Sequence, residues 1–319
     1  MAKQKKDPKT NVKIWGIRGG GMGDLMQASP ILNYMEKKYP GSYKYYVINR
    51  KCAQAAPVFL NHPLIDNVHV LEEWETLGPN DIKLRDSCDI IFDVNPPFRD
   101  KEWYNEMNAV DQAARMAGID DLDDVLSPEE KIPVLTKWWL NPEATKDVRN
   151  NGYRQIEYDT KTPTKKVGIF PFAMYNASNH TYDDAADNRQ RNPNLPWWEV
   201  VCELLSTDLG YEVRHFGWWD EPDIRFTDRY THDSYFEQIK LACECDVLIG
   251  TDTGTMWFPG ALGIPSIHLM TYWAPNHRSN PTAFEPVNKN GKLMFNENSC
   301  SRIKPMAVVD YVQSIIEKK

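Results

Sequence analysis

Short apolar runs alternate with longer amphipathic segments along almost the whole chain, and this alternation constrains the fold more than any other feature. Runs of four to seven residues predict buried strands, and the amphipathic segments predict helices that connect parallel strands. We expect strands at 12–17, 44–48, 67–71, 89–94, 166–171, 211–216, 246–250 and 265–270. We expect helices at 24–38, 102–117, 197–209, 234–245, 255–262 and 305–317. The predicted fold class is therefore α/β.

The length of the chain predicts two domains. Its 319 residues, of which 41% are hydrophobic, are enough for two separate cores. The segment 119–164, rich in Asp, Pro and Thr, separates the two sets of strands. We therefore expect domains at 1–163 and 164–319, both on one strand–helix–strand plan. The helix at 305–317 belongs to the second domain in this interpretation, with packing back onto the first as the alternative.

Composition excludes several classes of protein. No apolar run reaches the roughly 18 residues of a membrane-spanning helix, which predicts a cytoplasmic protein without a transmembrane segment. Six scattered cysteines without a C-x-x-C pair predict reduced thiols rather than a metal site. A formal net charge of −8 disfavours a nucleic-acid partner without excluding one. The oligomeric state stays open.

The stretch IWGIRGGGMGDLMQASPIL, residues 14–32, holds five glycines within eight residues, between a predicted strand and a predicted helix. Such a turn gathers backbone N–H groups and the positive end of a helix, which suits an anion or a polar ligand. A dinucleotide fingerprint fails because Asp24 stands where the third glycine is required, and no Gly-Lys-Ser/Thr follows for a P-loop. A tight turn without a ligand is the alternative. The candidate residues of this turn are Arg18, Gly19, Gly20, Gly21 and Gly23.

Asp24 has two interpretations from its position alone. A carboxylate in the first turn of a helix is stabilised by the helix dipole and by N–H groups, which predicts a capping role. A carboxylate at the carboxyl edge of a parallel sheet also stands where α/β proteins place their chemistry, which predicts a general base.

A second turn of this kind follows the predicted strand 246–250. Thr251-Asp252-Thr253-Gly254-Thr255 leads directly into a short helix, so that hydroxyls and N–H groups could surround a phosphate or diphosphate. A capped helix with a purely structural role is the alternative, because Thr and Asp are preferred caps.

These stretches resemble the ADP-heptose:lipopolysaccharide heptosyltransferases. GIRGGGMGDLMQASPILNYMEKKYP is similar to the N-terminal motif of that family, and YFEQIKLACECDVLIGTDTGTMWFPGALGIPSIHL is similar to its C-terminal motif. LPWWEVVCELLSTDLGYEVRHFG resembles the stretch between them. The resemblance covers residues 12–48 and roughly 165–270.

The resemblance implies a GT-B architecture, in which two Rossmann-like domains face each other across a cleft. It implies an inverting, metal-independent glycosyltransferase without a cofactor, whose N-terminal domain binds the acceptor and whose C-terminal domain binds a nucleotide-diphosphate sugar. Asp24 matches the catalytic aspartate of the family. Asp252, Thr253, Gly254 and Thr255 match its donor-phosphate site, and Glu221 lies where a glutamate of the family accepts hydrogen bonds from ribose; a solvated surface glutamate is the alternative.

Two positions depart from the family pattern. Pro193 stands at the place of a phosphate-contacting lysine, which leaves Arg189 and Arg191 as the candidate cations. Trp257 stands at the place of a histidine, and its indole cannot accept a proton. Because an indole can stack on a ring, we expect Trp257, together with Met256, to contact the donor nucleoside or sugar. These departures leave the donor open.

Other candidates have a structural interpretation that is at least as strong. The acidic cluster at 120–124 contains an Asp-x-Asp, a pattern that can chelate a metal, but its composition favours a solvated loop. The tryptophan pairs at 138–139, 197–198 and 218–219 could form sugar platforms, but packing in a core or a domain interface is favoured. His277 and Arg278 are better candidates than His268.

Three hypotheses of function remain. The first is a glycosyltransferase that acts on a glycan or another hydroxyl acceptor; a modified nucleobase as acceptor is not favoured. The second is a catalytically silent protein that binds a nucleotide or a sugar on the same fold. The third is a nucleotide-sugar epimerase of GT-B shape.

Overall fold

The chain divides into two compact units, Met1–Ile156 and Glu157–Lys319, in a computed structural model. The structure describes residues 11–17, 21–74, 76–94, 107–133, 135, 137, 165–172, 175–176, 181–182, 191–217, 221–230, 234–251, 253–271 and 290–318. The boundary expected at residue 163 lies outside these ranges.

The first unit is built on a parallel sheet in the order β3-β2-β1-β4. Its strands are β1 (Lys13–Gly16), β2 (Tyr43–Ile48), β3 (Asn67–Val70) and β4 (Ile90–Phe92). Its α-helices are α1 (Met22–Ala28), α2 (Ile31–Lys38), α3 (Ala56–Phe59), α4 (Pro79–Asp86), α5 (Ala109–Met116) and α6 (Leu122–Val125). The described part of this unit also contains two 3₁₀ turns, η1 (Arg50–Ala55) and η3 (Pro128–Lys131). The chain runs from β1 through β2 to β3 at one edge of the sheet and then returns to place β4 on the other side of β1. This strand order is that of the first half of a Rossmann sheet.

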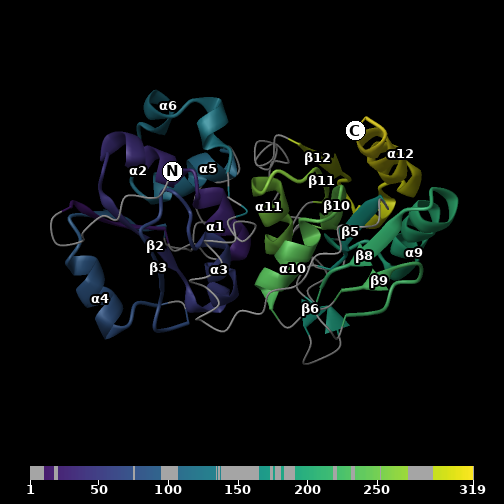
Figure 1. Cartoon of the computed structure of the whole chain (residues 1–319), viewed down its shortest axis with the longest axis horizontal. Helices are drawn as coiled ribbons and strands as arrows, with labels where there is room; N and C mark the ends of the chain where they lie inside the picture. The colour runs from purple at the N-terminus through teal and green to yellow at the C-terminus, as the bar shows by residue number, and fades with distance from the viewer. Residues whose placement is uncertain are drawn as a thin grey trace. The chain divides into compact units, whose positions relative to one another are not determined.

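The helix expected at 24–38 is broken in the structure. Pro30 has no N–H to donate and caps the start of α2, while the hydroxyl and the N–H of Ser29 both turn back to the carbonyl of Met26. The two shorter helices, α1 and α2, therefore replace one long one (Figure 1).

The second unit has a parallel six-stranded sheet in the order β12-β11-β10-β5-β8-β9. Its strands are β5 (Lys166–Phe170), β8 (Glu212–His215), β9 (Asp228–Arg229), β10 (Val247–Thr251), β11 (Ser266–Met270) and β12 (Gly291–Phe295). Read from β9, the sheet holds the third, second, first, fourth, fifth and sixth of these strands, which is the doubly wound Rossmann order. A separate antiparallel pair is formed by β6 (Tyr175–Asn176) and β7 (Thr181–Tyr182).

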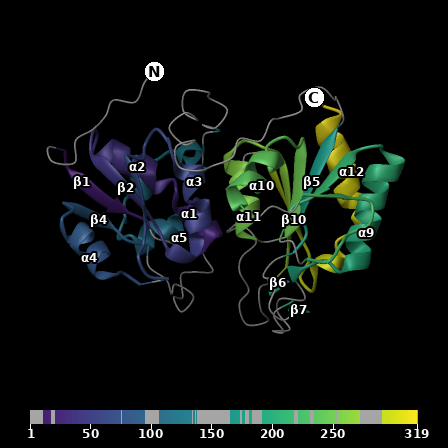
Figure 2. The same ribbon diagram turned by 60° about the horizontal axis from the view of Figure 1, so that its bottom comes forward.

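Helices cover both faces of this sheet (Figure 2). Two helices, α9 (Leu195–Glu203) and α12 (Pro305–Ile316), lie on one face. A π-helical turn (η5, Leu204–Asp208) continues α9. On the other face lie α10 (Tyr235–Ala242) and α11 (Gly254–Ala261). A 3₁₀ turn (η7, Cys300–Arg302) precedes α12. Because α12 packs against α9 and β10, the last helix belongs to the second unit.

Every strand predicted from the sequence is present, which confirms the α/β class. The tryptophan pair Trp197 and Trp198 lies in the core of the second unit, where the indole N–H of Trp197 donates to the carbonyl of Ile303 at 2.7 Å. The six cysteines are free thiols. No helix of the described chain is long and apolar enough to cross a membrane.

Candidate functional site

The two sheets each have one point where the chain order reverses, between β1 and β4 in the first unit and between β5 and β10 in the second. Ligands of doubly wound proteins bind outside the carboxyl ends of the strands at such points. The β1–α1 turn and the β10–α11 turn, the two stretches singled out in the sequence, lie there.

The carboxyl end of β1 carries backbone strain. The buried Ile17 has φ of 68°, a left-handed conformation that a β-branched residue rarely adopts and that costs about 1–2 kcal/mol. Its N–H donates to the carbonyl of Phe92 at 2.8 Å, which ties the end of β1 to the end of β4. The chain is thereby turned out of the sheet just before the glycine turn, of which Arg18, Gly19 and Gly20 lie outside the described residues.

Asp24 occupies the third position of α1 and is half-buried. Its Oδ2 accepts a hydrogen bond from the backbone N–H of Gly21 at 2.6 Å. Gly21 has no side chain to return the bond, so only one half of a capping box is formed. The sequence interpretation of Asp24 as a capping residue is therefore confirmed, and the cap also fixes where its carboxylate points.

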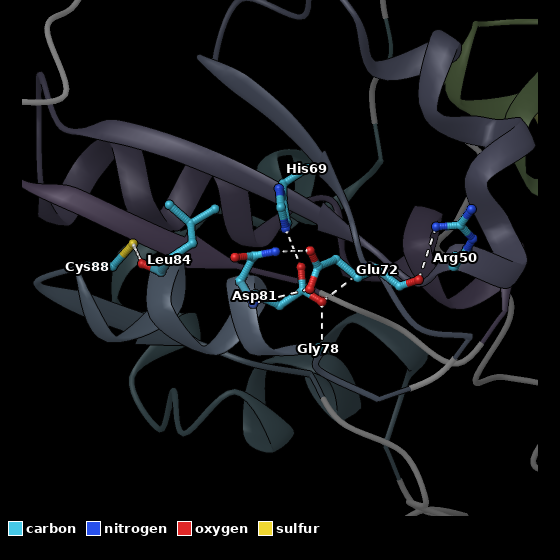
Figure 3. Close-up of polar contacts among 8 residues, drawn as sticks. Arg50, His69, Glu72, Gly78, Asp81, Leu84 and Cys88 are labelled. Carbon is cyan, nitrogen blue, oxygen red and sulfur yellow. Dashed lines mark hydrogen bonds and ion pairs between the residues drawn. The ribbon is translucent and has the colours of Figure 1, made fainter.

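Asp81 repeats this arrangement at the start of α4. Its Oδ2 accepts from the N–H groups of Gly78 at 2.8 Å and Glu72 at 3.0 Å, and its Oδ1 lies 2.7 Å from Nε2 of His69 (Figure 3). Burial raises the pKa of this carboxyl, but the hydrogen bonds from Glu72, His69 and Gly78 outweigh burial and hold its pKa below the ordinary value. Asp81 is fully buried and is a structural carboxylate.

The β10–α11 turn in the second unit places hydroxyls at a helix start. The side chain of Thr251 is fully buried, and the hydroxyls of Thr253 and Thr255 are hydrogen-bonded to each other. The N–H of Thr253 donates to the carbonyl of Thr251 at 2.7 Å, so the N–H groups that open α11 begin with Gly254. Asp252 lies outside the described residues.

Two residues expected on the donor nucleoside or sugar, Met256 and Trp257, are buried in the structure. Met256 lies in the core with Phe170 and Phe216, where its sulfur occupies the space that a side chain on Gly250 would need. Trp257 is only 3% exposed, and its ring packs on His268 with centroids 5.3 Å apart. Sequence reasoning placed these side chains by motif, whereas the helix turns both of them inward.

Glu221 is 5% exposed, so the alternative of a solvated surface glutamate is wrong. Its Oε2 lies 3.3 Å from Nε2 of His215, which is fully buried at the end of β8. Sequence reasoning missed His215. The signal was a histidine at the carboxyl end of a predicted strand.

Of the two candidate cations, the structure describes Arg191. Arg191 is 8% exposed just before α9, and Arg189 lies outside the described residues, as do His277 and Arg278. His268 is buried and its Nε2 lies 3.0 Å from the hydroxyl of Ser266, in agreement with a packed role.

Among the described residues, no three His, Cys, Asp or Glu side chains gather as a metal site would require. The acidic cluster at 120–124 is solvated at Asp120, Asp123 and Asp124, as expected, but it is not a loop throughout, because Leu122–Val125 form α6. Asp121, just before α6, is bonded to the hydroxyl of Tyr34 at 2.7 Å and to Lys38 at 2.6 Å, both on α2. Asp123 pairs with Lys131.

Several solved glycosyltransferase structures resemble this one along nearly the whole chain. The glycosyl transferase family 9 protein from Veillonella parvula DSM 2008 superposes with a TM-score of 0.65 at 13% identity, covering 99% of this chain and 100% of that one. The E. coli ADP-heptose lps heptosyltransferase II gives 0.65 at 14% identity, covering 96% and 99%. The E. coli heptosyltransferase WaaC with ADP gives 0.58 at 13% identity, covering 95% and 99%.

This chain shares their fold. No protein-family model and no curated protein sequence matches it. The heptosyltransferase resemblance seen in the motifs therefore extends to the fold over nearly the full length.

Proposed function

We propose that the chain is an inverting glycosyltransferase that moves a sugar from a nucleotide-diphosphate sugar to an acceptor hydroxyl. The observation that carries the proposal is the pairing, within a glycosyltransferase fold, of an oriented carboxylate at one switch point and a threonine-rich helix start at the other. Asp24 is the carboxylate, and Thr253, Gly254 and Thr255 form the helix start.

Asp24 acts as the general base in this mechanism. The acceptor hydroxyl gives its proton to the Asp24 carboxylate while its oxygen bonds to the anomeric carbon. The bond from that carbon to the diphosphate breaks, and the nucleoside diphosphate leaves with the electron pair. Attack from the face opposite the leaving group inverts the anomeric centre.

The donor lies on the second unit in this proposal. The N–H groups of Gly254 and Thr255, together with the positive end of α11, stabilise charge on the leaving diphosphate without a metal or another cofactor. Arg189 and Arg191 are the candidate cations, and Glu221 accepts hydrogen bonds from the ribose. Solved relatives of the fold contain ADP or an ADP sugar, which supports a nucleoside-diphosphate donor.

The acceptor is a glycan or another hydroxyl compound, and we place the reaction in the cytoplasm. A net charge of −8 disfavours a nucleic-acid acceptor. Pro193 and Trp257 stand where the family that the chain resembles has a lysine and a histidine. These two replacements favour a second candidate function, a catalytically silent protein that binds a nucleotide or a sugar.

The sharpest test is the conservative variant Asp24→Asn. An amide oxygen still accepts from the Gly21 N–H, so α1 keeps its cap, but an amide cannot take a proton. A thermal-shift panel with ADP, GDP, UDP and CDP first selects the base, and release of that diphosphate from the matching nucleotide sugars is then followed. We expect turnover to fall about 100-fold or more, with the thermal shift by the diphosphate unchanged.

Asp81→Asn is the matched control, because Asp81 caps α4 through Gly78 as Asp24 caps α1 through Gly21. It should keep its turnover per folded molecule. Full turnover in Asp24→Asn would remove Asp24 as the base. Diphosphate binding without turnover in the native protein would favour the silent binding protein.

A further inference from the structure

In the first unit, Trp74 lies on the surface. Its side chain is 66% exposed, whereas the other tryptophans that the structure describes, at positions 15, 197, 198 and 257, are at most 6% exposed. Within the described chain, the ring of Trp74 stacks on no other ring or cation, and its indole N–H makes no hydrogen bond. Both the face and the donor of this indole are therefore open to a ligand.

The segment that carries Trp74, between β3 and α4, is held in place. The N–H of Lys51 donates to the carbonyl of Trp74 at 3.4 Å, and Nη1 of Arg50 donates to the carbonyl of Glu72 at 3.0 Å (Figure 3). The Glu72 carboxylate accepts from the backbone N–H of Asn80 at 3.2 Å and from the side-chain amide of Asn80. An exposed aromatic side chain on a fixed backbone loses little conformational entropy when a ligand covers it.

Trp74 lies at the same edge of the first sheet as Asp24. Trp74 follows β3 and Asp24 follows β1, and the strands β3, β2 and β1 are parallel and adjacent. Neighbouring strands are spaced by about 4.8 Å, so that the carboxyl ends of β1 and β3 lie about 10 Å apart. An oligosaccharide with its reacting hydroxyl at Asp24 is long enough to place a second ring over Trp74.

The surroundings of the ring indicate the chemistry of its ligand. An indole has a face of negative potential and an N–H donor, which match the C–H groups on the face of a pyranose ring and the hydroxyls around its rim. The sequence around the ring, residues 72–75, is Glu-Glu-Trp-Glu, so that three glutamates stand against the two nearby cations, Arg50 and Lys51. Carboxylates accept hydrogen bonds from hydroxyls and repel anions. The ring therefore fits an uncharged sugar better than a nucleic acid or an anionic lipid.

We infer that Trp74 is the platform on which an uncharged sugar ring of the acceptor glycan lies. The inference rests on the proposed function, because it takes this sugar as the acceptor. A tryptophan on which a ligand packs supplies a large share of the binding energy. Removing the indole therefore weakens the binding of the acceptor and leaves the binding of the donor unchanged.

The test uses three uncharged trisaccharides as probes, maltotriose, cellotriose and mannotriose, with trigalacturonic acid as the charged counterpart. Binding is followed by fluorine NMR on protein whose eleven tryptophans are replaced by 5-fluorotryptophan, with and without the diphosphate selected by thermal shift. The resonance that is missing in Trp74→Phe belongs to Trp74. We expect at least one uncharged probe to shift this resonance saturably, with an affinity about 10-fold or more above that of trigalacturonic acid.

Calorimetry on variants then measures the contribution of the ring. Trp74→Ala should weaken the binding of that trisaccharide about 10-fold or more, and Trp74→Tyr, which keeps an aromatic face, should recover part of the loss. The affinity for the diphosphate should stay within about 2-fold in both variants. Ile82→Ala is the matched control, because Ile82 is an exposed apolar side chain on α4 of the same unit, and it should leave both affinities unchanged.

The outcomes separate this inference from the proposed function. The inference is overturned if no uncharged probe binds, if binding is the same in Trp74→Ala, or if trigalacturonic acid binds equally well. A dimer in analytical ultracentrifugation, or binding to phosphatidylglycerol vesicles, that disappears in Trp74→Ala also overturns it, because a second copy or a lipid then covers the ring. These results leave the proposed function standing. Trisaccharide binding that depends on Trp74, in a protein that releases no diphosphate from any nucleotide sugar, overturns the proposed function and leaves the sugar site.

Discussion

Asp24 and Asp81 occupy the same local position in two helices. Each is the third residue of a helix and accepts from the N–H of the glycine that precedes the helix. Asp81 is enclosed by Glu72 and His69, whereas Asp24 stands at a switch point of the sheet. The local geometry is shared, so the surroundings decide which carboxylate is a candidate for chemistry.

Asp81→Asn should lower the free energy of unfolding by about 1–3 kcal/mol at pH 7, because a buried, hydrogen-bonded charge is lost. The folded-state pKa of Asp81 is depressed, so its ionised form stabilises the native state above the unfolded pKa of about 3.9 and loses this effect as the pH falls through the folded value. The difference between native protein and variant should therefore shrink below about pH 4. Urea unfolding at pH 7 and pH 3 measures it, and a difference independent of pH would contradict the assignment.

Side-chain direction was the part of the candidate site that the sequence could not supply. Motif spacing located Asp24, Thr253 and Glu221 in the segments that follow β1, β10 and β8, as the structure has them. It did not show that Met256 and Trp257 are buried, because a short helix at a sheet edge buries most of its faces, and an apolar stretch has no periodicity that says which face remains.

At the scale of elements, the buried strands were predictable, whereas two edge strands of the second sheet, β9 and β12, were not. The central strands β5, β10 and β11 are buried on both faces and read as continuous apolar runs. By contrast, β9 has two residues, and β12 is half-buried with a lysine inside it. Such edge strands are fixed by pairing with a neighbour, which one sequence does not display.

The close approach of β5 to its neighbours predicts a cost for the substitution Gly168→Ala. A Cβ there would lie 2.3 Å from Leu248 and 2.8 Å from the Phe216 ring, both packed in the core. We expect a loss of about 1–3 kcal/mol in unfolding free energy from overpacking.

Gly16→Ala on β1 is the matched comparison for this prediction. Its new Cβ would meet only the terminal methyl and sulfur of Met35 within 3.2 Å, and a flexible thioether can rotate away. Urea midpoints of the two variants should therefore differ, with Gly168→Ala the less stable. Equal midpoints would mean that the core around β5 yields as easily as Met35 does.

At the scale of the whole molecule, the chain divides into two compact units, each with its first strand inside its sheet. The α/β class was predictable because crossover connections and buried strands leave strong periodic signals. The strand order itself came only from the structure, since hydrophobic patterns say that a strand is buried but not which strand lies beside it.

If the donor binds to the second unit alone, amide hydrogen exchange should report this. A saturating nucleoside diphosphate should slow exchange at the start of α11 and in residues 221–224, by up to about 100-fold at a free concentration 100 times Kd. Amides of β2 and β3 should exchange at unchanged rates. Protection confined to the first unit would reverse the assignment of donor and acceptor.

In the proposed reaction Asp24 is used twice, as a cap and as a base, and this has an evolutionary consequence. A carboxylate that a helix needs for its own start is maintained by selection for folding, whatever chemistry is later added to it. Under this proposal, a descendant that stopped transferring sugars would still keep the aspartate. Inactive branches arising from such an ancestor would then be recognised by changes in residues that serve the reaction alone.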